Sequence, residues 1–221
     1  MAETIETTAL VGGVPVDDPD IARVIVDASA IEDAIEQLAA LVALRMREFS
    51  VFVPVATGGC AFASDLLRHV YVTQRAMREG DATRAYDRPV VACAMASSYG
   101  DGTVSGGATG VTTPGSATVR GKRVCVLEDI IDTGKTAMAI AEALYAAGAE
   151  EVAIIALMDK QARRDATAQK YFEDKNMKMA CAFLCPDEFV VGYGMDYQGK
   201  YRELPFVGVL KPEIFGASGE K

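Results

Sequence analysis

The fold is decided by R-V-C-V-L-E-D-I-I-D-T-G-K-T-A, residues 123–137. Its apolar run, residues 124–127, is typical of a strand that is buried on both faces of a parallel sheet. Two carboxylates follow, and the polar residues D-T-G-K-T then lead into a helix-forming run. A strand that ends in acidic residues and turns over a glycine into a helix predicts a ligand site at the carboxyl edge of the sheet.

The residue types at this turn favour a sugar phosphate as the ligand. The free N–H groups and the positive dipole end of a helix N-terminus suit a phosphate, Gly134 lets the backbone come close, and Thr133 and Thr136 add hydroxyl donors. Glu128 and Asp129 can accept hydrogen bonds from vicinal sugar hydroxyls and can hold Mg²⁺. A Walker A loop is excluded, because it requires a glycine at the position of Asp129.

The same stretch resembles a known motif. L-E-D-I-I-D-T-G-K-T is similar to the phosphoribosyl pyrophosphate motif of type I phosphoribosyltransferases, and closely similar to the version in hypoxanthine-guanine phosphoribosyltransferases. The resemblance implies that the motif binds this substrate with Mg²⁺ through Glu128, Asp129, Ile130, Ile131, Asp132, Thr133, Gly134, Lys135 and Thr136. We expect Asp132 to be the general acid/base for the purine ring proton, since it lies between the two acids and the phosphate cradle.

Length and composition predict one cytoplasmic domain. The chain has 221 residues, half of them hydrophobic, and no apolar run reaches the ~18 residues of a membrane span. A net charge of −9 argues against a general nucleic-acid binder. The N-terminus lacks the basic region of a signal peptide, and we interpret the five cysteines as reduced and mostly buried. Residues 1–20 are expected to be a loose tail and residues 21–221 the domain.

The next elements resemble the family too. Ser29-Ala-Ile-Glu32 is typical of a capping box that opens a helix reaching Phe49, and an apolar strand is expected over residues 51–56. Gly58 and Gly59 then form either a tight turn or an anion site built from backbone N–H groups. In the family, a Lys-Gly-Gly or Lys-Gly-Ser loop at this place contacts the pyrophosphate. This sequence has Thr57 at the lysine position.

Residues 98–115 are rich in glycine, serine and threonine and follow a predicted strand over residues 89–96. A segment of this length and composition is either a disordered insertion or an active-site lid. Ser98 and Tyr99 resemble the start of the family's mobile catalytic loop, which favours the lid.

A second signature lies toward the C-terminus, in P-D-E-F-V-V-G-Y-G-M-D-Y-Q-G-K-Y-R-E-L-P, residues 186–205. Phe189 offers a stacking face, Val190 an extended backbone for a flat heterocycle, Asp196 a cation ligand and Arg202 two bonds to a phosphate. The resemblance adds Lys160, after a strand predicted over residues 151–158, as the donor to the exocyclic oxygen of a purine. Taken by itself, Lys160 would be a solvated strand end.

Alternating strands and helices predict an α/β domain with a mostly parallel, twisted sheet and flanking helices. The resemblance adds a small hood built from the N- and C-terminal parts, and implies a homodimer or homotetramer. The implied reaction joins hypoxanthine, guanine or xanthine to the phosphoribosyl group of phosphoribosyl pyrophosphate and releases pyrophosphate. A phosphoribosyltransferase for another base and a non-catalytic ligand sensor of the same fold remain as alternatives, without nucleic-acid or membrane partners.

Overall fold

The computed structural model describes residues 9–11, 14–45, 48–77, 88–96 and 110–216 of the chain. Within these residues, no helix has the length and apolar character needed to cross a lipid bilayer.

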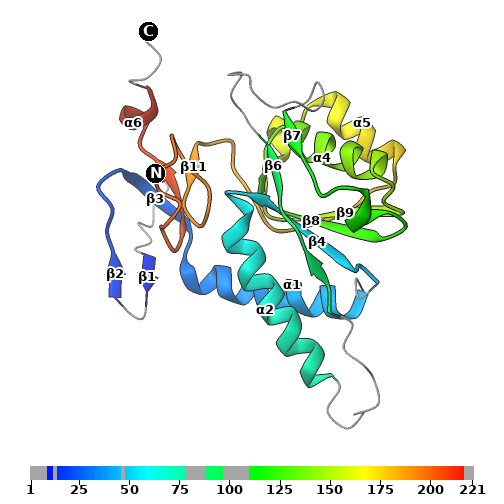
Figure 1. Ribbon diagram of the computed structural model, residues 1–221. Coiled ribbons are helices and arrows are strands. Elements are labelled where there is room, and N and C mark those ends of the chain that lie inside the picture. Colours follow the sequence, from blue (N-terminus) through cyan, green and yellow to red (C-terminus); the bar gives the residue numbers. More distant parts are fainter. Residues whose placement is uncertain (1–8, 12–13, 46–47, 78–87, 97–109, 217–221) are drawn as a thin grey trace.

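A seven-stranded sheet forms the centre of the molecule (Figure 1). Its strands are β4 (Val51–Ala56), β5 (Val90–Val91), β6 (Ala94–Ala96), β7 (Val111–Thr112), β8 (Arg123–Ile131), β9 (Glu151–Asp159) and β10 (Lys178–Leu184). They lie in the order β10-β9-β8-β4-β6-β7, and β5 pairs with β4 outside this path. Every pair is parallel except β6 with β7. The predicted α/β class with a mostly parallel sheet is confirmed.

Helices cover both faces of this sheet. Strand β8 is therefore buried on both faces, which explains its apolar sequence. The helices are α1 (Ala28–Arg45), α2 (Gly59–Ala76), α3 (Ser116–Val119), α4 (Lys135–Ala146), α5 (Ala166–Asp174) and the 3₁₀ turn η1 (Gln161–Arg163). Cys125 and Leu127 belong to a buried cluster with residues of α1 and α2. Val124 and Val126 point the other way, into a cluster with residues of α4 and α5. Alternate side chains of one strand therefore serve two cores.

A second, smaller sheet stands beside the first and is called the hood here. It consists of β3 (Ile21–Val26), β11 (Val190–Val191) and β12 (Val207–Leu210), antiparallel in the order β11-β12-β3, and is followed by helix α6 (Pro212–Gly216). The hood has its own small core. It therefore combines the N- and C-terminal parts of the chain (Figure 1).

Four local predictions differ from the structure. The helix expected to reach Phe49 ends at Arg45, and the strand expected over residues 89–96 is divided into β5 and β6. The segment expected to be a loose tail contains an antiparallel hairpin of β1 (Ala9–Val11) and β2 (Val14–Val16). The capping box expected at Ser29 is wrong, because α1 begins at Ala28 and Ser29 lies inside the helix. Asp27 supplies the cap, since its Oδ1 accepts a hydrogen bond of 2.8 Å from the N–H of Ala30.

Candidate active site

The two motif acids lie within the last part of β8, and not directly after the strand as expected. The ladder between β8 and β9 continues to the pair Ile131 and Asp159, so the backbone of both acids belongs to the sheet. The Glu128 side chain is buried, with 4% of the residue exposed. Burial raises the pKa of Glu128 well above its ordinary value, and the neighbouring charge of Asp129 raises it further.

Opposing effects act on the pKa of Asp129. Burial raises the pKa of its carboxyl group, while the N–H of Ile130, which donates to Oδ1 at 2.9 Å, and the charge of Arg202 lower it. Its other oxygen lies against the backbone of Gly58, where an added Cβ would stand 1.8 Å from Oδ2. The carboxylate therefore lies against the loop that follows β4.

The turn after β8, where the sequence predicts a phosphate cradle, leads directly into α4. Gly134 caps α4 with a φ of 81°, a conformation that favours glycine. The first turn of α4 presents N–H groups that have no intrahelical acceptor. The side chain of Lys135 points elsewhere, because its Nζ lies 3.1 Å from Asp165 Oδ2. The Lys135 side chain is therefore engaged in an ion pair, and the contact of Lys135 with the substrate stays a prediction.

Two backbone segments meet at the opposite wall. Gly194 of the hood, at φ 100°, packs so tightly on Gly58 that an added Cβ would lie 2.1 Å from the Gly58 carbonyl oxygen. Gly59 faces the core instead, since its Cβ would lie 2.6 Å from the carbonyl oxygen of Leu127. Of the two predicted loop glycines, only Gly58 lines the site, next to Thr57.

The hood brings a cation and a carboxylate to the same wall. Arg202 Nη2 lies 2.8 Å from Asp196 Oδ1, and its Nη1 donates to the carbonyl oxygen of Gly194 at 2.5 Å. The second oxygen of Asp196 accepts a bond of 2.6 Å from the N–H of Gly199. These contacts fix both side chains at the mouth of the cleft.

These walls enclose a cleft of about 270 Å³ at the carboxyl end of the sheet. Eleven of the predicted residues line it: Gly58, Glu128, Asp129, Ile130, Ile131, Asp132, Thr133, Gly134, Thr136, Asp196 and Arg202. Ser98 and Tyr99 lie outside the described residues. A larger cavity of about 610 Å³ between α1 and α2 is lined by none of the predicted residues.

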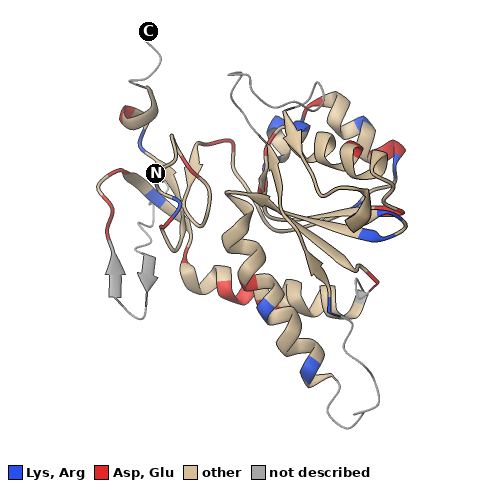
Figure 2. Cartoon of the chain, viewed as in Figure 1, with Lys and Arg blue, Asp and Glu red and all other residues tan. Residues whose placement is uncertain are grey.

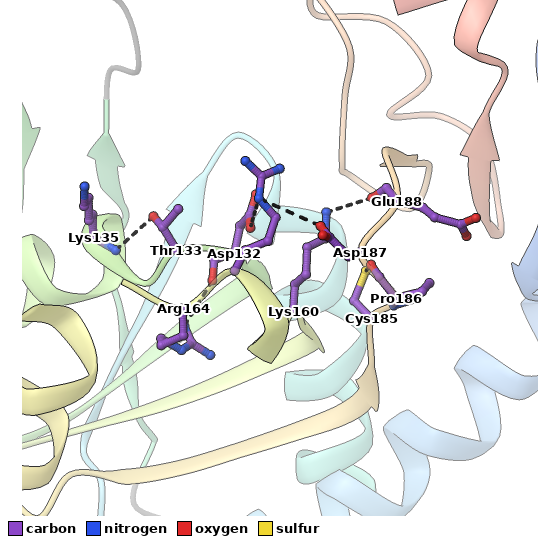
Figure 3. A network of polar contacts seen from close by, with 10 residues as sticks. Asp132, Thr133, Lys135, Lys160, Arg164, Cys185, Pro186, Asp187 and Glu188 are labelled. Atoms are coloured by element: carbon purple, nitrogen blue, oxygen red, sulfur yellow. Dashed lines mark hydrogen bonds and ion pairs between the residues drawn. The ribbon is translucent and has the colours of Figure 1, made fainter. Parts of the chain in front are cut away.

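Lys160 is not a solvated strand end, because only 4% of the residue is exposed. Its Nζ donates to the carbonyl oxygen of Glu188 at 2.8 Å, and its N–H donates to the carbonyl oxygen of Ile131 at 2.9 Å. The second contact places it beside Asp132 (Figure 3).

One oxygen of Asp132 accepts no hydrogen bond among the described residues. Its Oδ1 is buried and, within the described part of the chain, has no hydrogen-bond donor. Arg163 Nε forms an ion pair with this oxygen at 3.6 Å and lies 3.9 Å from Asp187 Oδ1. A buried acceptor without a donor is costly and usually has a functional reason. Sequence reasoning missed Arg163, which carries no signal beyond its charge.

The stacking residue belongs to an aromatic cluster. Phe189 keeps 37% of its surface exposed and stacks on Phe215 of α6, with ring centroids 5.0 Å apart and planes inclined by 21°. The ring of Tyr197 meets it edge-on at 5.5 Å. Val190 is buried in β11 and pairs with Val209. Phe215 was not predicted, because nothing in the local sequence links it to Phe189.

The carboxylates suit a divalent cation that the substrate helps to bind. No three described His, Cys, Asp or Glu residues form a group able to hold a metal alone. Mg²⁺ usually takes one or two carboxylates together with substrate phosphates. Glu128, Asp129 and Asp196 line one cleft and offer such oxygens, so the donor set fits.

Comparisons with known proteins identify the family of the chain. Residues 24–198 match the phosphoribosyl transferase domain family. The hypoxanthine-guanine phosphoribosyltransferase of Bacillus subtilis is 32% identical over 197 residues, which cover 89% of this chain and 97% of that protein. The bifunctional protein TilS/HprT of Listeria innocua is also 32% identical, over 96% of this chain, although the chain spans only 29% of its length.

Solved structures are similar as well. A hypoxanthine phosphoribosyltransferase from Staphylococcus aureus superposes with a TM-score of 0.66 at 29% identity, covering 89% of this chain and 95% of that one. A hypoxanthine phosphoribosyl transferase of Trypanosoma cruzi has a TM-score of 0.73 at 22% identity, over 92% and 98% of the two chains, and supports the fold alone. The chain therefore belongs to the phosphoribosyl transferase domain family and, within it, to the hypoxanthine-guanine phosphoribosyltransferases.

Proposed function

We propose that this protein moves the 5-phosphoribosyl group of phosphoribosyl pyrophosphate to a 6-oxopurine, giving a nucleoside 5′-monophosphate and pyrophosphate. The observation that carries the proposal is Asp132 Oδ1, a buried oxygen beside the buried Lys160 that accepts no hydrogen bond among the described residues and has only an ion pair of 3.6 Å with Arg163. Asp132 lines the cleft that also holds the predicted phosphate cradle. An acceptor and a cationic donor side by side match the N7 and O6 edge of an oxopurine.

Each part of the donor substrate has a matching wall. The backbone of residues 133–136 suits the 5′-phosphate at the start of α4, and Glu128 and Asp129 suit the ribose hydroxyls. The guanidinium of Arg202 and the N–H of Gly58 suit the departing pyrophosphate. Mg²⁺, held by Asp129 or Asp196 together with substrate oxygens, would neutralise phosphate charge.

The base side supplies orientation and a proton acceptor. Lys160 would donate to the 6-oxo group, while Phe189 stacks on the ring and Val190 pairs with its edge. Asp132 would take the proton that the purine nitrogen loses as its bond to the sugar forms. Because the sugar develops positive charge as pyrophosphate leaves, stabilising that leaving group is the second task of the site.

The test is pyrophosphate release when the protein meets phosphoribosyl pyrophosphate, Mg²⁺ and a panel of bases. Release with hypoxanthine, guanine or xanthine is expected, and the panel ranks these three. Release only with adenine, uracil or orotate would support another phosphoribosyltransferase. Binding without release would support a ligand sensor, although Figure 2 shows the Lys and Arg residues of the described part interspersed with acidic residues.

Lys160 should set the preference for oxopurines. Lys160→Met keeps the length of the side chain but removes the charged donor, which is typically worth 1.5–3 kcal/mol. We expect KM for hypoxanthine to rise roughly 10- to 150-fold, with KM for phosphoribosyl pyrophosphate nearly unchanged. Steady-state kinetics with each substrate varied in turn checks this. An unchanged preference over adenine would remove Lys160 from base recognition.

Phe215 should influence base binding from behind Phe189. An aromatic pair contributes about 0.5–1.5 kcal/mol beyond the burial of its area. Phe215→Leu is therefore expected to weaken binding of the base or nucleotide roughly 2- to 13-fold. Calorimetric titration with a nucleoside monophosphate and with pyrophosphate separates the two ends of the site. Equal losses for both ligands would contradict a role at the base.

A cytoplasmic location and a homo-oligomeric state are also part of the proposal. All five cysteines are free thiols, which suits a reducing compartment. Analytical ultracentrifugation measures the number of subunits.

A further inference from the structure

A buried ion pair lies directly behind the phosphate cradle. Arg164 Nη2 bonds to Asp159 Oδ1, and the two side chains are only 9% and 12% exposed. The second oxygen of Asp159 accepts a hydrogen bond of 3.1 Å from Gln161 Nε2. Buried ion pairs seldom add stability over a well-packed apolar pair, so this one invites a functional explanation.

The guanidinium of Arg164 also supports the loop above it. Its Nη1 lies 3.4 Å from the carbonyl oxygen of Asp132, within hydrogen-bonding distance (Figure 3). The same nitrogen lies 2.8 Å from the point where a Cβ on Gly134 would be, and the guanidinium carbon is 6.0 Å from the ring centre of Phe172. The loop of residues 132–134 therefore packs on the planar guanidinium of Arg164, which is bonded to Asp159 and lies beside the ring of Phe172.

Further bonds join the same two segments. The N–H of Lys160 donates to Ile131 at 2.9 Å, and the N–H of Asp165 donates to the Thr133 carbonyl at 2.9 Å. The segment that begins at Asp159 thus runs along the loop of the phosphate cradle, and Arg164 is its only described side chain with a bond to that loop's backbone. These hydrogen bonds link the segment that contains Lys160 to the loop of the phosphate cradle.

We propose that Arg164 is a positioning residue for the transfer reaction. Held by Asp159, its guanidinium fixes the backbone at Asp132 and Gly134, and so sets the cradle and the direction of the Asp132 carboxylate relative to Lys160. It acts through the loop, and no substrate atom needs to touch it. This inference rests on the proposed function.

The test variant is Arg164→Lys. Lysine can keep the ion pair with Asp159, but a single ammonium lacks the planar fork that reaches Asp159 and the Asp132 carbonyl together. We expect a melting temperature close to that of the wild type, a dissociation constant for ribose 5-phosphate raised roughly 2- to 10-fold, and a chemical step slowed about 10²-fold by the misdirected carboxylate. Lys170→Met removes an exposed ion pair with Asp174 in the neighbouring helix and should change none of these.

A double-mutant cycle separates positioning from general damage. If Arg164 acts through Asp132, adding Arg164→Lys to Asp132→Asn should slow the chemical step far less than it slows the wild type. Additive losses in the cycle would overturn the proposal. So would a ribose 5-phosphate affinity and a chemical step within two-fold of wild type in the single variant.

If Arg164→Lys fails to fold, a second variant tests the same role. Asp159→Asn with Arg164→Gln leaves no buried charge alone, and it should show the same loss of affinity and rate. Wild-type values in that variant would also refute the role. Binding of ribose 5-phosphate tests the cradle without the transfer reaction. If the wild type binds this ligand but transfers no base, the proposed function is refuted. The affinities of the variants for ribose 5-phosphate would still show whether Arg164 positions the cradle.

Discussion

Replacing Asp132 by asparagine is expected to lower kcat by about 10²–10⁴-fold, the largest effect of any single change proposed for this protein. Asparagine preserves the shape of the side chain but cannot take a proton. Oδ1 of Asp132 is a buried acceptor without a hydrogen-bond donor among the described residues, and the purine proton would complete it. Nucleotide affinity should change far less, because the amide oxygen still accepts a hydrogen bond.

The measurement must isolate the chemical step, since slow product release can hide part of the loss. Rapid-quench kinetics of a single turnover serves this purpose. Asp187→Asn is the matched control, because Asp187 faces the same Arg163 at 3.9 Å but is exposed. A chemical step within a few-fold of wild type in Asp132→Asn would leave Asp132 as a turn-forming residue.

Gly58→Ala is expected to be the most damaging change at the pyrophosphate wall. The added methyl group would stand 1.8 Å from Asp129 Oδ2, and atoms cannot approach so closely. Either the carboxylate or the loop must move, and overpacking of this kind typically costs about 1–3 kcal/mol of stability. Because Gly194 of the hood also rests on Gly58, the hood loop with Asp196 should shift as well. We expect kcat/KM for phosphoribosyl pyrophosphate to fall by about 10² or more.

Gly216→Ala is the control, since a Cβ at Gly216 meets no atom within 4 Å. Steady-state kinetics and thermal unfolding should both separate the two variants. A Gly58→Ala enzyme with normal kinetics would show that the contact between this loop and Asp129 has no part in catalysis.

The sequence predicted those elements whose place in the fold follows from the local pattern of residues. The apolar run of β8 must be buried on both faces, and the glycine turn after it must lead into a helix, so both follow from composition and period. Strand β10 and helix α5 were not foreseen. β10 is an edge strand with a largely half-exposed or exposed pattern, and α5 has a short apolar face, so neither gives a strong periodic signal.

The candidate site shows the same difference between features set by the local sequence and features set by tertiary contacts. Residues that act through their own chemical type, such as Asp132 and Arg202, were predicted and line one cleft. Lys135 was predicted together with its motif, but the ion pair that its side chain forms with Asp165, thirty residues onward, could not be predicted from the local sequence. Arg164 and Phe215 were missed for the same reason: their roles exist only through partners brought together by the fold.

The stacked rings of Phe189 and Phe215 have a practical consequence for handling the protein. Phe215 belongs to helix α6, so a fusion partner or an affinity tag attached beside this helix would lie close to the ring of Phe189. A preparation damaged there would still capture sugar phosphates and pass a thermal-shift screen with pyrophosphate, yet report a falsely poor affinity for every purine.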